Sequence, residues 1–283
     1  MSNVGIIGNG FVGNAIATGL VGYVDKVRIF DVQPERSTNT LEEVVNYSDV
    51  VFVSVPTPMT NVLGGEIDLS VVRKAFTMIN RCKRRSSEPI FVLKSTVVPG
   101  TMETLCKDFP DLNLVFSPEF LTERYARLDF INSARVVLGG DQKHVNKVAD
   151  LLRPRFPGAK FITTDFATSQ LIKYMANCFF AMKVSFMNEM YQCAMACEAD
   201  WGTAISGFIS DGRIGNSHLQ VPGHDGDMGF GGKCFPKDLN AMIHWCSENK
   251  VEPTMLKAAW DKNLEVRSNL DWKEIAGAVS ENE

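Results

Sequence analysis

A cysteine at the end of a glycine-rich segment is the residue whose surroundings point most directly to chemistry. Residues 229–238 read Gly-Phe-Gly-Gly-Lys-Cys-Phe-Pro-Lys-Asp. Pro236 suits the first turn of a helix, so we expect Cys234 near a helix N-terminus and beside Lys233, where both features favour the reactive thiolate. Asp238 would fall on the same side of that turn. A thiolate and a carboxylate placed this way suit covalent catalysis followed by activation of water, and an inert structural cysteine is the alternative.

A second pair of polar residues lies within a long helical pattern. Residues 167–200 contain no Gly or Pro, and their apolar side chains recur every three or four positions. Lys173 and Asn177 are four residues apart and share one face of this helix, where they could stabilise an oxyanion. A Lys173 on the solvated face is the alternative. At about thirty residues the helix is too long for an ordinary surface helix, which suits a spine between domains or the core of a dimer.

Three further polar residues follow apolar runs that are typical of strands. Glu119 and Glu123 come after the run 114–116, and Thr96 comes after the run 90–93. Ligand sites of open α/β sheets lie at the carboxyl ends of strands, so these side chains are candidates for one site. The structural alternatives are a carboxylate at a helix start for either glutamate and an N-cap role for Thr96.

The N-terminal segment predicts a turn that binds a dinucleotide. Residues 8–13 read Gly-Asn-Gly-Phe-Val-Gly between the apolar run 4–7 and a helical pattern, and Asp31 ends the next apolar run. The glycines of such a G-x-G-x-x-G turn let the backbone approach a pyrophosphate at a helix N-terminus. Asp31 would bind ribose hydroxyls and repel a 2′-phosphate, which favours NAD over NADP. A glycine-rich turn without a dinucleotide is the alternative.

The elements that must position these residues alternate between strands and helices up to residue 165. Short runs rich in Val, Ile and Phe are typical of strands buried on both faces, and segments of helical length separate most of them. The alternation predicts a parallel sheet with helices on both faces. The expected strands are 4–7, 27–30, 50–55, 90–93, 114–116, 136–138 and 161–162, and the expected helices are 11–20, 40–47, 69–84, 101–107 and 143–155.

Beyond residue 165 the pattern is mainly helical. The long helix leads into a glycine-rich loop over 211–234, and helical patterns return at 237–249 and 253–267. We therefore expect an α/β fold in two domains. Residues 1–165 would form a Rossmann-type domain with a parallel sheet, and residues 166–283 a mainly α-helical domain that carries the cysteine loop.

Composition and charge exclude several classes of protein. The 283 residues carry a formal charge of −4 and are 45% hydrophobic, which fits two globular domains and no nucleic-acid partner. The sequence contains no long apolar run and no signal-peptide pattern, so we expect neither a transmembrane helix nor a signal peptide. Seven cysteines without a CxxC pair indicate reduced thiols in the cytoplasm. His218 and His224 lack further ligands at zinc spacing, so no metal site is expected.

Seven segments, in this order, resemble the UDP-glucose/GDP-mannose dehydrogenase family over about residues 3–268. They are the glycine turn at 8–13, Val-Pro-Thr-Pro at 55–58, Lys-Ser-Thr-Val at 94–97, Ser-Pro-Glu-Phe-Leu at 117–121, Lys173 with Asn177, Asp-Gly-Arg-Ile-Gly at 211–215, and the cysteine segment at 230–238. The resemblance implies oxidation of the C6 alcohol of a nucleotide sugar to a carboxylate, with two NAD⁺ reduced. UDP-glucose, which would become UDP-glucuronate, is the expected substrate.

The resemblance also implies a role for each candidate residue. Cys234 would be the nucleophile, which traps the aldehyde as a thiohemiacetal that a second hydride transfer converts into a thioester. The other implied catalytic residues are Glu119 as acid/base, Lys173 and Asn177 as oxyanion stabilisers, and Asp238 and Thr96 as residues that position or activate water. The implied cofactor-binding residues are Gly8, Gly10, Phe11, Val12, Gly13, Asp31, Pro56, Thr57, Thr96 and Glu123. The implied substrate-binding residues are Glu119, Phe120, Leu121, Lys173, Asn177, Arg213, Phe230, Gly231, Gly232 and Cys234.

The same resemblance implies partners. The long helix would form a homodimer in which Arg213 reaches the substrate of the neighbouring subunit. Family members usually carry a C-terminal α/β lobe that holds the nucleotide, and this chain stops where that lobe would begin. We therefore expect a natural short form or a chain cut at the domain boundary, with weak affinity unless a partner chain supplies the lobe. Arg124, where the family has Gly, and the long polar loop 216–227 leave the sugar open.

Two other functions are possible. An NAD dehydrogenase of the 3-hydroxyacid type has the same fingerprint and a catalytic lysine on a helix, but it transfers one hydride and needs no cysteine. Cys234 therefore discriminates between the two enzymes. A non-catalytic nucleotide-binding homologue would bind NAD without turnover, and the presence of every implied catalytic residue counts against it.

Overall fold

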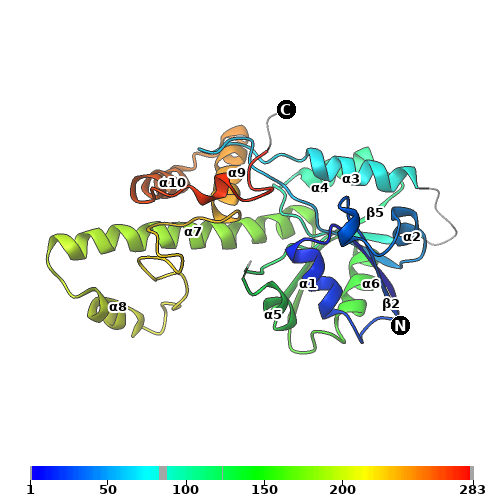
Figure 1. Cartoon of the computed structure of the whole chain (residues 1–283), viewed down its shortest axis with the longest axis horizontal. Helices are drawn as coiled ribbons and strands as arrows, with labels where there is room; N and C mark the ends of the chain where they lie inside the picture. Colours follow the sequence, from blue (N-terminus) through cyan, green and yellow to red (C-terminus); the bar gives the residue numbers. More distant parts are fainter. Residues whose placement is uncertain (1, 83–87, 123, 281–283) are drawn as a thin grey trace. The chain divides into compact units, whose positions relative to one another are not determined.

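The computed structural model describes residues 2–82, 88–122 and 124–280, which form two compact units (Figure 1). The first unit comprises residues 1–57 and 69–173, and the second comprises 58–68 and 174–283. This division falls within the long helix, beyond the expected domain boundary at residue 165. It also assigns 58–68 to the second unit, which the sequence pattern did not predict.

A seven-stranded sheet forms the centre of the first unit, in the order β2-β1-β3-β4-β5-β6-β7. All the expected strands are present: β1 (Asn3–Ile7), β2 (Lys26–Phe30), β3 (Val50–Val53), β4 (Ile90–Leu93), β5 (Asn113–Phe116), β6 (Arg135–Gly140) and β7 (Lys160–Thr164). Neighbouring strands are parallel, as expected, except that β6 pairs antiparallel with β5. In the described part of the connection between these two, α5 (Ala126–Ile131) is the one helix and it is short, so the chain turns back beside β5 without a full helical crossover.

Two hydrophobic cores cover the two faces of this sheet, because successive strand residues point to opposite sides. On β1, for example, Ile6 belongs to one core and Ile7 to the other. The helices α1 (Phe11–Gly19), α5 and α6 (Gln142–Leu152) pack into the first core, and α2 (Leu41–Asn46), α3 (Ser70–Arg81) and α4 (Thr101–Asp108) pack into the second. Helix α2 starts at a capping box, in which Thr40 accepts the N–H of Glu43 and the Glu43 carboxylate accepts the N–H of Thr40.

The second unit is helical. It contains the C-terminal part of α7 (Phe166–Ala196) together with α8 (Trp201–Ile209), α9 (Phe235–Glu248) and α10 (Thr254–Val266). Helix α8 was not predicted; Asp200 caps it by accepting the N–H of Thr203 at 2.7 Å. As expected, the loop 211–234 contains no helix or strand.

The segment 58–68 is held in the second unit by two tryptophans. The indole of Trp260 donates to the carbonyl of Leu63 at 3.1 Å, and that of Trp272 donates to the carbonyl of Val62 at 2.8 Å. Trp272 is fully buried. These long-range contacts explain why the segment leaves the first unit. Among the described residues, no helix combines the length and the apolar character needed to cross a bilayer.

Candidate active site

The glycine turn of the first unit has a geometry that only glycine permits. Gly8 has a φ of +89°, and a Cβ on Gly13 would lie 1.9 Å from the carbonyl oxygen of Gly8. A Cβ on Gly10, in contrast, would meet no atom within 4 Å. Gly10 is the N-cap residue of α1, and no side chain caps this helix. The backbone around Gly10 is therefore open to a phosphate at a helix N-terminus, which fits the pyrophosphate of NAD.

Asp31 lies beside this turn at the end of β2. One carboxylate oxygen accepts the N–H of Asn9 at 2.6 Å, and the other accepts the N–H of Gln33 at 2.9 Å. The backbone N–H of Asp31 itself donates to Ser37 Oγ at 2.7 Å. Phe11 at the start of α1 is exposed, and Val12 is half-buried. The carboxylate is thus fixed next to the turn, where a ribose-binding residue is needed.

A buried ion pair joins two expected catalytic residues of the first unit. Lys173 is 2% exposed, and its Nζ lies 3.0 Å from Oε1 of Glu119. The other carboxylate oxygen of Glu119 accepts the N–H of Leu121 at 2.6 Å. A solvated position for Lys173 is therefore wrong. The helix-start alternative for Glu119 is also wrong, because the next helix, α5, begins only at Ala126. Glu123 lies outside the described residues.

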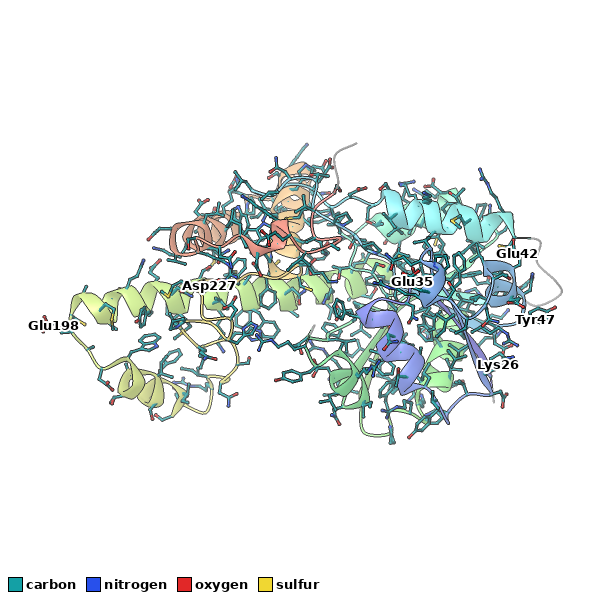
Figure 2. All side chains as sticks on the ribbon, viewed as in Figure 1. Lys26, Glu35, Glu42, Tyr47, Glu198 and Asp227 are labelled. Atoms are coloured by element: carbon teal, nitrogen blue, oxygen red, sulfur yellow. The ribbon has the colours of Figure 1, made fainter. Side chains whose placement is uncertain are left out.

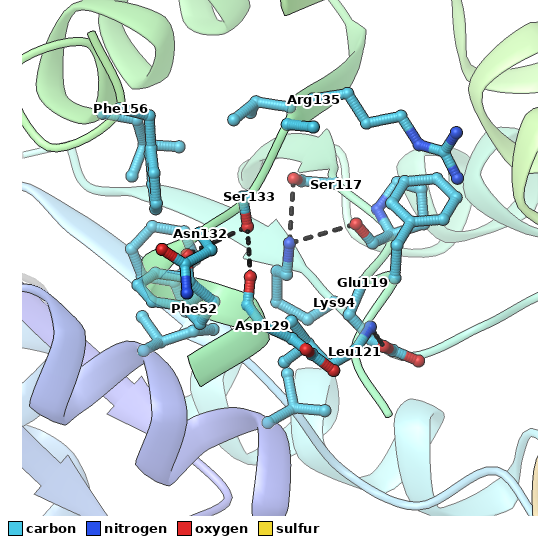
Figure 3. A pocket seen from close by; sticks show the side chains of 18 of the residues that line it. Phe52, Lys94, Ser117, Glu119, Leu121, Asp129, Asn132, Ser133, Arg135 and Phe156 are labelled. Atoms are coloured by element: carbon cyan, nitrogen blue, oxygen red, sulfur yellow. Dashed lines mark hydrogen bonds between the residues drawn. The ribbon is translucent and has the colours of Figure 1, made fainter. Parts of the chain in front are cut away.

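A cavity of about 370 Å³ in the first unit is bordered by Glu119 (Figure 3). Apolar side chains from α1, α5 and the sheet line one part of it, and Glu119, Asp129 and Arg135 lie among its polar residues. The guanidinium of Arg135 stacks over the ring of Phe120, 4.0 Å from its centroid. The candidate Glu119 thus borders a space large enough for part of a small ligand.

Lys94 also lines this cavity, and the sequence interpretation missed it. Its Nζ donates to Ser117 Oγ at 3.0 Å and to the carbonyl of Pro118 at 3.3 Å. The pKa of Lys94 is lowered to about 7, chiefly by burial; the charge of Glu119 opposes this shift, and that of Lys173 adds to it. A lysine directly after β4, which is buried on both faces, was the signal that could have found it.

Two threonines of the expected cofactor site are buried. Thr57 is 6% exposed and Thr96 is 7% exposed, whereas the neighbouring Pro56 is exposed. The N-cap alternative for Thr96 is wrong, because α4 begins at Thr101 with Gly100 as its N-cap residue. Burial without a capping role keeps Thr96 a candidate for the site.

Cys234 occupies the N-cap position of α9 in the second unit. Pro236 lies in the first turn of that helix, as predicted, and the backbone N–H of Asp238 donates to the carbonyl of Cys234 at 2.8 Å. Cys234 is half-buried, and all seven cysteines are thiols. The local geometry therefore places a thiol at a helix N-terminus, the environment that favours a nucleophilic thiolate.

The carboxylate of Asp238 is buried one turn further along α9. Asp238 is 1% exposed; it accepts a hydrogen bond of 2.6 Å from the amide of Asn177 and pairs with Nζ of Lys237.

The hydroxyl of Tyr174 lies buried without a hydrogen-bond partner among the described residues, and burial, reinforced by Asp238, raises the pKa of that phenol well above its usual value. The sequence places Lys173 and Asn177 on one face of the long helix. In the structure Lys173 bonds to Glu119, and Asn177 bonds to Asp238.

The loop before Cys234 carries the remaining candidates. Phe230 is 4% exposed, and Gly231 and Gly232 are half-buried. The side chain of Arg213 is 88% exposed, and its guanidinium forms a forked pair with Asp211. His218 stacks on Phe180 with 4.2 Å between ring centroids. No cluster of metal-ligating side chains occurs in the part of the chain that is described.

Comparison with known proteins gives this arrangement a family. Residues 36–155 match the NAD binding domain of the UDP-glucose/GDP-mannose dehydrogenase family, and residues 167–265 match its central domain. A UDP-glucose 6-dehydrogenase of Rickettsia conorii is 33% identical over 246 residues, which is 83% of this chain and 53% of that protein. The chain thus spans about half the length of the curated relatives it matches.

Solved structures agree with the sequence matches. A UDP-glucose dehydrogenase from the hyperthermophilic archaeon Pyrobaculum islandicum superposes with a TM-score of 0.82 at 27% identity, over 94% of this chain and 68% of that one. A 3-hydroxyisobutyrate dehydrogenase of Mycobacterium tuberculosis superposes with a TM-score of 0.74 over 94% of this chain and 93% of that one, but at 19% identity it shows a shared fold alone. Since two successive domains of one family account for most of the sequence, the chain belongs to the UDP-glucose/GDP-mannose dehydrogenase family.

Proposed function

We propose that this chain oxidises the C6 alcohol of a nucleotide sugar to a carboxylate, with UDP-glucose as the expected substrate and UDP-glucuronate as the product. Bound NAD would supply the hydride acceptor for each of two oxidation steps. The observation that carries the proposal is the Cys234 thiol at the N-terminus of α9, with the fixed carboxylate of Asp238 one turn further on. An enzyme that transfers a single hydride needs neither this thiol nor this carboxylate.

The first oxidation would convert the alcohol to an aldehyde, with loss of one hydride and one proton. Glu119 is a suitable acid/base for that proton, because it is a largely buried carboxylate at the cavity of the first unit. Lys173 and Asn177 lie one turn apart on α7, and their donors suit the negative charge that develops on the sugar oxygen. Thr57 and Thr96 would border the nicotinamide.

The second oxidation requires a covalent step. The Cys234 thiolate adds to the aldehyde carbon, and the alkoxide of the resulting thiohemiacetal gives up its hydride, which a second NAD⁺ would accept, to become a thioester. Water then attacks the thioester carbonyl, which releases the carboxylate and returns the thiol. Asp238 is held by Asn177 and Lys237, and this fixed orientation supports its role, with Thr96, in positioning or activating that water.

We also propose that the chain forms a homodimer through α7. Met175, Phe179 and Phe186 are 63%, 61% and 51% exposed, and their spacing puts them on one side of the helix. An apolar stripe of this kind marks a protein contact. The exposed Arg213 agrees with a role toward the neighbouring subunit.

The seven thiols are consistent with the reducing cytoplasm, where we propose that the protein acts.

The decisive experiment is to count the NADH produced per sugar consumed. UDP-glucose, GDP-mannose and UDP-N-acetylhexosamines would be supplied with excess NAD⁺ to the wild-type chain and to Cys234→Ser. Two NADH per sugar, with loss of carboxylate formation in Cys234→Ser, is the expected result. Full turnover of an alcohol by Cys234→Ser would refute the four-electron scheme, and NAD binding without turnover of any sugar would favour a non-catalytic homologue.

A further inference from the structure

Arg267, directly after α10, is the centre of a charged network that the roles above do not use. Its side chain is 1% exposed, and its Nη2 lies 2.8 Å from Asp225, 3.1 Å from Asp271 and 3.6 Å from Asp227. Asp225 and Asp227, the latter labelled in Figure 2, belong to the glycine-rich loop before Cys234. One buried guanidinium therefore ties this loop to the end of α10.

The other donors of Arg267 strengthen that tie. Its Nη1 donates to the carbonyl of Met228 at 3.2 Å, and its Nε donates to the carbonyl of Asn269 at 2.7 Å. The amide of Asn269 in turn donates to Asp227 at 3.0 Å. The planar fork of arginine reaches all of these acceptors at once, which a single ammonium group cannot do.

The backbone immediately before Cys234 is fixed by the same region of the unit. Both the N–H and the carbonyl of Phe230 bond to the side-chain amide of Asn263, at 2.7 and 3.1 Å. The N–H of Gly232 donates to Asp271 at 3.0 Å. Asp271 therefore links Arg267 to a residue two positions before Cys234.

The surroundings of Gly231 show how closely the loop packs against Arg267 and Asp271. A Cβ on Gly231 would lie 2.3 Å from Nη2 of Arg267 and 2.3 Å from Oδ1 of Asp271. A side chain on Gly231 would therefore have to displace the ends of Arg267 and Asp271, which would disturb the network.

The charges make Arg267 the element on which the arrangement depends. Burial alone would raise the pKa of Asp225, but the hydrogen bond and charge of Arg267, with the N–H of Asp227, outweigh burial and lower this pKa. Without the guanidinium, Asp225, Asp227 and Asp271 would repel one another, and the attachment of residues 225–228 to the end of α10 would weaken.

We propose that Arg267 is a positioning residue for Cys234: it holds the loop 225–232 on α10 and so fixes the orientation of the Cys234 thiol at the N-terminus of α9. The proposal rests on the proposed function for its biological meaning, although its test does not require turnover. If the loop detaches, the backbone that leads into Cys234 is no longer fixed, and the thiol loses its constant orientation at the helix N-terminus and with it part of the stabilisation of its thiolate. A residue that merely stabilised the fold would not change the ionisation of one particular thiol.

The test is the pH dependence of alkylation at Cys234, followed by mass spectrometry after treatment of the full chain with iodoacetamide. We expect Arg267→Lys to raise the midpoint of this profile by about 0.5–1 pH unit. The exposed cysteines Cys193 and Cys197 should keep their profiles, and NAD affinity should be unchanged. The matched control is Lys257→Gln, which removes an exposed cation of α10.

Asp225→Asn is the second variant, because it weakens the network by one charge and keeps the shape of the side chain. We expect a smaller shift of the Cys234 midpoint in the same direction. A wild-type midpoint in a folded Arg267→Lys or Asp225→Asn chain, with folding checked by circular dichroism, would overturn the proposal. If the midpoint moves as expected while no sugar is oxidised, the proposed function fails and the positioning role of Arg267 stands.

Discussion

Asn177 on α7 donates a hydrogen bond of 2.6 Å to the carboxylate of Asp238 on α9, and both side chains are buried. Lys237 pairs with the other oxygen of the same carboxylate. An amide and an ammonium group thus hold Asp238 in one orientation. The same contact joins two helices of the second unit, so it bears on stability as well as on chemistry.

Asn177→Ala should therefore impair both properties. The buried carboxylate of Asp238 would lose one of the two side-chain donors that the described residues give it, which costs about 1–3 kcal/mol of unfolding free energy. We expect a lower urea midpoint, together with at least tenfold slower formation of the carboxylate product. The matched control is Asn249→Ala, which removes an exposed amide that bonds to the backbone at the end of α9. Wild-type stability and rate in Asn177→Ala would show that the contact is incidental.

Lys94 should make the unfolding free energy of the chain increase as the pH rises. Its pKa is lowered from 10.5 to about 7, so between about pH 7 and 10.5 the unfolded chain binds one proton more than the folded chain. Unfolding free energy therefore rises with pH across this window, and it falls as the pH drops toward 7, where the buried amine must take up its charge.

Lys94→Met should remove this rise. Urea midpoints measured between pH 7 and 10 should flatten in the variant, whereas Lys143→Met, a change at an exposed lysine of α6, should keep the wild-type slope. If the urea midpoint depended on pH equally in Lys94→Met and in the wild type, the Lys94 amine would be charged across this whole pH range.

Most of the fold could be predicted because its signal is local. Each strand of the sheet is a short apolar run between polar segments, and the 31-residue helix α7 contains no glycine or proline to interrupt it. The antiparallel pairing of β6 could not be predicted, because strand direction depends on the path of the connecting chain. Helix α8 escaped prediction because its glycines at 202 and 207 weaken the helical pattern.

The candidate site was predictable to the extent that its residues follow a motif or a helical turn. Such patterns single out Cys234, Asp238 and Asn177 as candidates. They do not single out Lys94 or Arg267, whose burial and partners distant in sequence only the structure shows. Arg267 lies 42 positions from Asp225, and such a pairing leaves no periodic trace in a single sequence.

Asp31 should set the preference for NAD. Its carboxylate already accepts two backbone N–H groups, so Asp31→Asn keeps the side chain's shape while it removes the charge that repels a 2′-phosphate. We expect about tenfold weaker NAD binding and a much smaller difference between NAD and NADP, measured by calorimetry. Asp25→Asn, at an exposed carboxylate before β2, should leave both affinities unchanged. An undiminished preference in Asp31→Asn would assign the discrimination to other residues.

The apolar stripe on α7 should control the oligomeric state. Phe179 is 61% exposed between Met175 and Phe186, so Phe179→Glu would put a charge at the centre of the proposed dimer contact, where it would have to be buried without a partner. We expect sedimentation velocity to show a dimer for wild type and a monomer for Phe179→Glu. Met255→Glu is the matched control, because Met255 on α10 is 68% exposed and lies outside the stripe. A Phe179→Glu dimer as tight as the wild type would exclude this face of α7, and a monomeric wild type would exclude the dimer itself.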